Sequence, residues 1–293
     1  MSVLAIEGPT DPDIPLVLDS PHSGSDYPAD FRPAVGPRIY RRAEDMDVEV
    51  LFGDAPSLGA PLLHALFPRV YVDVNRARSD IAAEAMEGDP PFEPRPGPKA
   101  ALGKGVIWTA APPGPHGQGE GQGEGRPTPL YDAPLPAAEV EGRLARYWDP
   151  YRARLTDLLR GVRERHGRVH YIDCHSMQAV STAMHEEGAG RPRADIVLGD
   201  RDGASCDPAF TALARDALAA EGFEVAVNDP YKGADLVAAH GRPGEGVHAL
   251  QIEVNRRLYM DEAGLERTDA FDATRERLGR ALATIASGLR GPG

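Results

Sequence analysis

The sequence predicts an α/β fold in which helices cover both faces of a central sheet. Six short apolar runs have the pattern of strands, and most are continuous, which is typical of strands buried on both faces. Helical patterns lie between these runs, and such interleaving favours a layered α/β sandwich. The length of 293 residues, with 41% hydrophobic side chains, allows one large domain or two smaller ones.

The expected strands begin with the run IPLVLD, which leads directly into a Pro/Gly turn. In chain order, the strands are predicted at residues 14–19, 69–74, 168–174, 194–199, 223–228 and 247–254. The helices are predicted at residues 137–165, 208–221 and 262–289. The second helix has the clearest boundaries, because Asp207 can cap its start, Pro208 suits its first helical position and Gly222 ends it.

Residues 111–128 interrupt this pattern, because Gly and Pro dominate the segment and few apolar side chains occur in it. A segment of this composition cannot bury enough surface to fold by itself. We predict a flexible loop here, which is either disordered or a lid over a site.

Composition excludes several classes of partner. The formal net charge is −13, from 32 Lys and Arg against 45 Asp and Glu, which disfavours nucleic acid and anionic membranes and favours a small-molecule partner. No signal peptide or apolar stretch of membrane-spanning length occurs, so we expect a cytoplasmic protein. Cys174 and Cys206 are far apart and form no CxxC motif, which predicts two reduced thiols.

Polar residues follow the predicted strands, at the edge where open α/β sheets bind ligands. His22 follows the first strand and His175 ends another, although a single histidine in a turn is more commonly a surface residue. The acidic stretch with Glu44, Asp45 and Asp47 completes the set of two histidines and a carboxylate that a catalytic zinc site needs. Carboxylates at a helix start are also stabilised by the helix dipole without any metal.

Further candidates lie at two other strand ends. Gln251 and Glu253 fall on the same side of the last strand, and a Glu in an apolar strand needs a cation, a metal-bound water or a substrate. Asn75 and Arg76 follow the run VYVDV, where an Arg fork can bind a carboxylate. Arg69 is either a second anion contact or a surface cation.

The glycine-rich segment that precedes the last strand carries Lys232 and His240. Binding residues concentrate on such loops, but an ordinary surface connection has the same composition.

Several blocks in register resemble the N-formylglutamate amidohydrolase family from about residue 14 to residue 262: PHSG, the acidic stretch before LF, YVDVNR, DCHSM, DGASCDP, YKG…HGRPGEGVHALQIEVN and YMDE. The resemblance implies a single domain with a three-layer α/β/α fold and a mixed sheet, of the phosphorylase/hydrolase type shared with zinc carboxypeptidases and aspartoacylase-like deacylases. It also implies hydrolysis of N-formyl-L-glutamate to formate and L-glutamate, a step of histidine breakdown.

By the same resemblance, His22, Asp45 and His175 would bind one Zn²⁺ per chain, or another divalent metal, with Glu44 and Asp47 as alternative carboxylates. Glu253 would act as general base and acid towards the attacking water and the departing amine.

The substrate contacts follow from the resemblance as well. Arg69 would polarise the scissile carbonyl, while Asn75 and Arg76 would clamp the terminal carboxylate of an N-acyl dicarboxylic amino acid. Lys232 and His240 would contact its side-chain carboxylate or the developing oxyanion, and Gln251 would line the same site. Two alternatives stand beside this hypothesis: a zinc carboxypeptidase-like hydrolase of peptides or other N-acyl amino acids, and an inactive binding protein.

Overall fold

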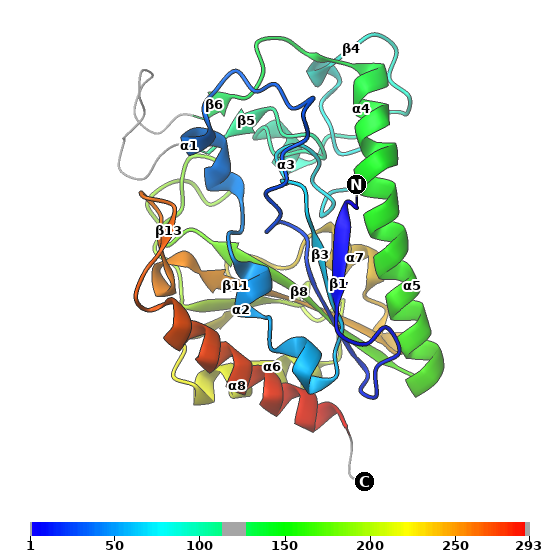
Figure 1. The fold of residues 1–293 in the computed structure, drawn as a ribbon, viewed down its shortest axis with the longest axis vertical. Helices are drawn as coiled ribbons and strands as arrows, with labels where there is room; N and C mark the ends of the chain where they lie inside the picture. Colours follow the sequence, from blue (N-terminus) through cyan, green and yellow to red (C-terminus); the bar gives the residue numbers. More distant parts are fainter. Residues whose placement is uncertain (1, 113–126, 291–293) are drawn as a thin grey trace.

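The computed structural model describes residues 2–112 and 127–290. Within them, a seven-stranded sheet has the order β1-β3-β2-β8-β11-β9-β10 (Figure 1). Its strands are β1 Leu4–Glu7, β2 Leu16–Ser20, β3 Leu62–Ala65, β8 Val169–Met177, β9 Ile196–Gly199, β10 Val225–Val227 and β11 Val247–Asn255. The four central strands β3, β2, β8 and β11 are parallel, whereas β1 and the β9–β10 pair run against their neighbours β3 and β11. The sheet is therefore mixed, as predicted.

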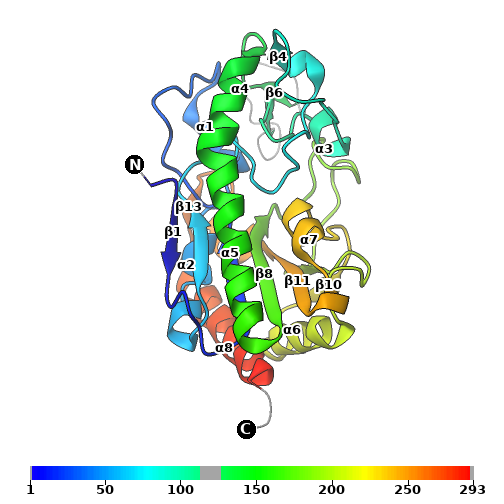
Figure 2. The ribbon, with the colours of Figure 1, turned by 90° about the vertical axis from the view of Figure 1, so that its right-hand side faces the viewer.

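Helices cover both faces of this sheet (Figure 2). One face carries α4 Ala137–Arg143, the π-helical turn Leu144–Trp148, α5 Asp149–His166 and α7 Asp235–His240, and the other carries α2 Val48–Leu51, α6 Pro208–Ala220 and α8 Phe271–Leu289. Each helical layer packs on its own apolar core. The prediction of a three-layer α/β/α sandwich is confirmed.

Short elements lie beyond the carboxyl ends of the parallel strands (Figure 2). They include α1 Pro37–Tyr40, α3 Pro98–Ala101, β4 Met86–Glu87, β5 Ala110–Ala111, β6 Thr128–Pro129 and β7 Leu135–Pro136. A small antiparallel hairpin, formed by β12 Met260–Asp261 and β13 Glu266–Arg267, precedes α8. The site described below lies between these elements and the edge of the sheet.

The alternation of side chains along the strands decides which residues reach that site. On β8, Ile172 belongs to the core under α6 and α8, whereas Tyr171 belongs to the core under α5 and α7. Asp173 and His175 follow Tyr171 at intervals of two, so they lie on the same face. This face is apolar near the strand starts and polar near the carboxyl ends.

The strand predicted at residues 69–74 is wrong, and the last predicted helix is wrong in part. Residues 69–74 form turns and irregular chain, and the strand of this region is β3, upstream at Leu62–Ala65. The apolar side chains of the predicted strand, among them Val70 and Val72, are fully buried against neighbouring layers, so their apolar run indicates burial rather than pairing. The last helix starts at Phe271, because the β12–β13 hairpin occupies the preceding residues. Strand β1 was not predicted.

The other predicted strands and helices overlap observed elements. Both cysteines are buried free thiols, as predicted. Most of the predicted loop at 111–128 lies outside the described residues, and its flanks β5 and β6 pair antiparallel. No helix in the described part of the chain is long and apolar enough to cross a membrane.

Candidate active site

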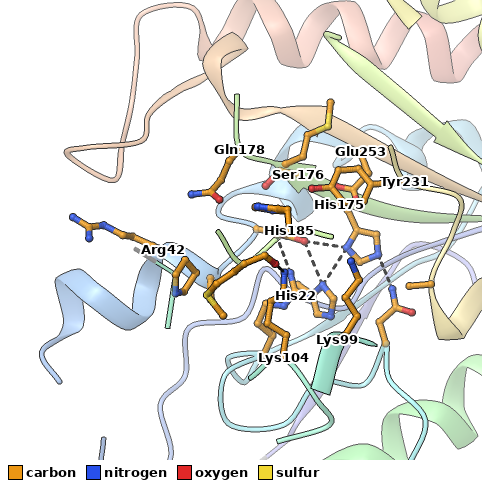
Figure 3. A pocket seen from close by; sticks show the side chains of 18 of the residues that line it. His22, Arg42, Lys99, Lys104, His175, Ser176, Gln178, His185, Tyr231 and Glu253 are labelled. Atoms are coloured by element: carbon orange, nitrogen blue, oxygen red, sulfur yellow. Dashed lines mark hydrogen bonds and ion pairs between the residues drawn. The ribbon is translucent and has the colours of Figure 1, made fainter. Parts of the chain in front are cut away.

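A cavity of about 740 Å³, including its open mouth, lies at the carboxyl edge of the sheet (Figure 3). Basic groups dominate its lining: Arg42, Arg69, Arg76, Lys99, Lys104 and Arg256. The carboxylates among the lining residues are Asp45 and Glu253. This excess of positive charge suits an anionic ligand in a protein that is acidic overall.

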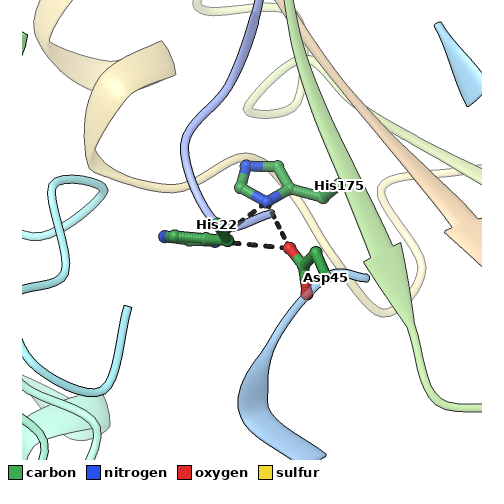
Figure 4. Close-up of side chains that lie close together, drawn as sticks. All are labelled: His22, Asp45 and His175. Atoms are coloured by element: carbon green, nitrogen blue, oxygen red, sulfur yellow. Dashed lines mark hydrogen bonds and ion pairs between the residues drawn. The ribbon is translucent and has the colours of Figure 1, made fainter. Parts of the chain in front are cut away.

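Three segments bring a possible metal-binding group to this cavity (Figure 4). His22 lies in the turn after β2, Asp45 lies just before α2, and His175 lies near the end of β8. The Nδ1 atom of His175 is 3.1 Å from Nδ1 of His22 and 2.9 Å from Oδ2 of Asp45. The structure therefore brings together the three residues that the sequence predicts as ligands. The alternative carboxylates point elsewhere: Glu44 bonds to Arg41 and Asp47 pairs with Arg267.

The donor set fits a divalent metal ion. A tetrahedral zinc ion with bonds of about 2.0–2.1 Å keeps its ligand atoms about 3.3 Å apart. The three donor atoms here are separated by 2.9–3.3 Å. The other ring nitrogens are held by carboxylates, because Nε2 of His22 lies 2.7 Å from Asp73 and Nε2 of His175 lies 2.7 Å from Asp173. These contacts direct both Nδ1 atoms toward the common point.

Asp45 uses its second carboxylate oxygen to bind two arginines. Its Oδ1 accepts from Nη2 of Arg256 at 3.0 Å and from Nη1 of Arg69 at 3.3 Å. Burial opposes ionisation, but the Arg69 guanidinium and the hydrogen bonds to His175 and His22 outweigh it and hold the pKa of Asp45 well below its usual range. Asp45 is therefore an ionised carboxylate with Oδ2 directed at the histidines.

Asp73 is a second buried carboxylate with many partners. Beside His22, it accepts hydrogen bonds from the Trp108 indole at 3.0 Å, from Nη2 of Arg69 at 3.1 Å and from the backbone N–H of Asn75 at 2.9 Å. Burial raises the pKa of Asp73, but His22 and the neighbouring arginines reverse this and lower it well below the usual value. Asp73 stays ionised and fixes the His22 ring.

Asp173 on β8 lies directly opposite another aspartate, Asp19, on the neighbouring strand β2. The hydroxyls of Tyr151 and Tyr171 both donate to Asp19 at 2.8 Å. Burial, followed by the charge of Asp173, raises the pKa of Asp19 well above its usual value. A neutral Asp19 places no second negative charge beside Asp173.

The Asn75 side chain is occupied by protein contacts. Its Nδ2 lies 2.9 Å from Asp173 and 2.9 Å from Nε2 of His175, and its Oδ1 accepts from the N–H of Leu236 at 2.8 Å. These contacts orient His175. Arg76 lines the cavity, with Nε bonded at 3.0 Å to the carbonyl of Lys104.

Glu253 lies on β11 beside the possible metal-binding group and lines the cavity. Gln251 donates from Nε2 to Oε1 of Glu253 at 2.7 Å, so the two side chains share one face, as predicted. The N–H of Ala234 donates to Oε1 of Gln251 at 2.8 Å and fixes the amide orientation. Burial raises the pKa of Glu253 to about 7.

Two expected substrate contacts lie outside the cavity. Lys232 is largely exposed, and its ammonium pairs with Asp202 at 2.8 Å. His240, on α7, packs edge-on against Tyr171 with ring centroids 6.2 Å apart. The cavity lining includes neither side chain.

Sequence reasoning missed four site residues: Asp73, Asp173, Lys104 and Arg256. The two aspartates had a detectable signal, because each is a single charge inside the apolar runs VYVDV and HYIDC, where an unpaired charge is costly. Arg256 directly follows the last strand and so had the strand-end signal of the other candidates, whereas Lys104 lies in a loop and had none.

Comparison with known proteins defines the class as an amidohydrolase of α/β fold. A family model described as N-formylglutamate amidohydrolase matches residues 14–260. The chain belongs to the N-formylglutamate amidohydrolase family.

Individual relatives agree with this placement. The chain is 29% identical to an N-formylglutamate deformylase of Pseudomonas aeruginosa, over 93% of this chain and 92% of the relative. It is 28% identical to the N-formylglutamate deformylase of Pseudomonas putida, over 85% and 83% of the two chains. The crystal structure of N-formylglutamate amidohydrolase from Ralstonia eutropha matches with a TM-score of 0.88 and 40% identity, over 99% of both chains. A protein of Agrobacterium tumefaciens, at 18% identity and a TM-score of 0.56, shares the fold.

Proposed function

We propose that the protein is a zinc-dependent amidohydrolase that converts N-formyl-L-glutamate to formate and L-glutamate. The observation that supports this most directly is the convergence of His22, His175 and Asp45 beside Glu253 in a basic cavity. The names of the relatives supply the substrate, and the excess of Lys and Arg in the lining suits its two carboxylates.

In this proposal, His22, Asp45 and His175 hold the ion. A bound divalent cation supplies Lewis acidity, which polarises the formyl carbonyl and makes a nearby water more acidic. Glu253 accepts a proton from the attacking water, which adds to the formyl carbon. Glu253 then returns the proton to the amine nitrogen as the C–N bond breaks, so formate and the free amine of glutamate leave. A carboxylate with a pKa near 7 can perform both transfers at neutral pH.

The arginines contribute charge around the reacting group. Arg69 lines the cavity while its terminal nitrogens hold Asp45 and Asp73, so it stabilises negative charge that develops on the carbonyl oxygen. Arg76 provides a guanidinium for a substrate carboxylate. Asn75 acts through His175, as its contacts indicate. Lys232 and His240 have no role in the proposal because they lie outside the cavity.

The test combines metal analysis with formate release from N-formyl-L-glutamate, before and after chelation and zinc return. We expect one zinc per chain and activity that follows the metal. Glu253→Gln should keep the metal and reduce kcat by about 100-fold or more, since general acid–base catalysis contributes at least that factor.

Glu245→Gln, at an exposed glutamate in the turn before β11, is the matched control and should behave as wild type. Formate release that survives complete metal removal contradicts the proposal. Bound zinc with turnover of peptides, but none of N-formyl-L-glutamate, would favour the carboxypeptidase-like alternative.

A further inference from the structure

Lys104 is a buried lysine in the wall of the cavity. It lies in the loop between α3 and β5, and only 7% of it is exposed. Its ammonium donates to the carbonyl of Met184, which belongs to another part of the cavity lining. Figure 3 shows Lys104 near Lys99, on the side of the cavity below His22 and His175 in that view.

The acidic groups around Lys104 are engaged by other cations. Lys99 pairs with Glu186 at 3.0 Å, and Glu187, whose charge raises the pKa of Lys104, pairs with Arg193 at 2.6 Å. In the described part of the chain, no carboxylate oxygen lies within 4 Å of the Lys104 ammonium. A buried ammonium with one backbone acceptor is costly unless an anion joins it.

The charges around Lys104 also favour the binding of an anion. Burial, and after it the positive charges of Lys99, Arg76 and Arg69, lower the pKa of Lys104 to about 6. A carboxylate bound beside Lys104 would raise this pKa again and favour the protonated ammonium. The cavity therefore offers a binding position for an anion at Lys104, and residues 2–112 and 127–290 supply no carboxylate that pairs with it.

The position of Lys104 distinguishes two anion-binding regions. Arg69 contacts Asp45 directly, and Arg76 is 3.9 Å from Asp73, which holds His22, so these arginines adjoin the possible metal-binding group. Among the described residues, no hydrogen bond or ion pair joins Lys104 to Asp45, His22 or His175: its ammonium donates to Met184 and its backbone carbonyl accepts from Arg76 Nε. An N-acyl dicarboxylic amino acid also carries two anions, and its side-chain carboxylate is the one farther from the scissile bond.

We propose that Lys104 binds the side-chain carboxylate of the substrate and thereby selects acidic amino acids over uncharged ones of the same shape. This inference rests on the proposed function. Discrimination follows because only a carboxylate stabilises the protonated form of Lys104, whereas an amide in its place gains no ion pair, and such buried polar contacts discriminate strongly.

The experiment compares N-formyl-L-glutamate with N-formyl-L-glutamine, which is nearly isosteric and carries no side-chain charge. For Lys104→Met, kcat/KM for N-formyl-L-glutamate should fall about 10- to 100-fold, the effect of losing a charged hydrogen bond. The value for N-formyl-L-glutamine should change less than about twofold, so the preference for the acid disappears. An equal fall for both substrates overturns the proposal.

Lys232→Met is the matched control, because that lysine is outside the cavity, and it should leave both values unchanged. Lys104→Gln serves as a second variant if the Met variant does not fold.

A binding measurement separates failure of this inference from failure of the proposed function. Calorimetry should show that the zinc-loaded wild type prefers L-glutamate to L-glutamine and that Lys104→Met loses the preference. This result supports the role of Lys104 even if wild type releases no formate, which would refute only the proposed reaction. Equal binding of L-glutamate by both proteins, or binding by neither, overturns the role of Lys104.

Discussion

The His22 and His175 rings each use one nitrogen for a buried aspartate and leave the other for the common point with Asp45. A carboxylate behind an imidazole fixes its tautomer and increases its basicity, so Asp73 and Asp173 matter although neither contributes a ligand atom. Their negative charge is tolerated because neighbouring guanidinium, indole and amide groups donate to them.

Replacing Asp73 by Asn should therefore weaken metal binding by about 10- to 100-fold, because the His22 ring loses its charged partner. Competition with a chromogenic chelator measures this affinity. Asp13→Asn is the control and should bind as wild type, because this exposed aspartate precedes β2, at the opposite end of that strand from His22. Equal affinities for the Asp73 variant and wild type would show that the carboxylate does not support the ligand.

At the scale of elements, the turn after β2 is held against the chain that follows β3. A Cβ at Gly24 would lie 2.4 Å from the carbonyl carbon of Leu66, a distance that side chains do not tolerate. Absence of a side chain at Gly24 thus permits the close approach that positions His22, two residues earlier.

Gly24→Ala should destabilise the protein by about 1–3 kcal/mol through backbone displacement, and it should lower zinc affinity as His22 moves. Urea unfolding of the metal-free protein and chelator competition measure the two effects. Gly36→Ala is the matched control, since nothing lies within 4 Å of its added Cβ. If the Gly24 variant matched this control in both measurements, the close approach would have no role in placing His22.

The sequence predicts the layers and the central strands well because their apolar runs are fully buried, as in β8. The run at 69–74 misleads, since burial and strand pairing produce the same composition and only the fold separates them. The two histidines could be predicted because they lie at strand ends, and Asp45 because it belongs to an acidic stretch before a helix. The hydrogen bonds of Asn75 and the approach of Lys104 depend on loop geometry, for which the sequence carries no periodic signal.

For the whole molecule, one face of the sheet serves two purposes, with apolar packing at the strand starts and charged groups at the carboxyl ends. The opposite face, under α6 and α8, buries His170, which packs on Phe210 of α6 and stacks on His248 with ring centroids 4.9 Å apart. Burial lowers the pKa of His170 to about 4, and the nearby His248 and Arg168 lower it further. Because the unfolded value is near 6.5, the native state loses stability as pH falls from about 6.5 toward 4.

Between pH 7 and pH 5, His170 alone should cost the wild type about 2 kcal/mol of unfolding free energy. His170→Gln should reduce the difference between the two pH values by that amount, whatever its effect at pH 7. Urea unfolding of both proteins at both pH values measures this, because the other titrating groups cancel in the comparison. An unchanged difference would mean that His170 accepts a proton equally well in the folded and unfolded chain.

The strand β11 lies in the middle of the sheet, between β8 and β9, yet it is the last of the seven in the chain. During synthesis, β8 and β9 therefore expose unpaired edges until residues 247–255 have left the ribosome. This nine-residue strand also carries Glu253. Any chain that stops before this strand lacks both the centre of its sheet and the proposed base, so premature termination yields an aggregation-prone fragment instead of a partly active enzyme.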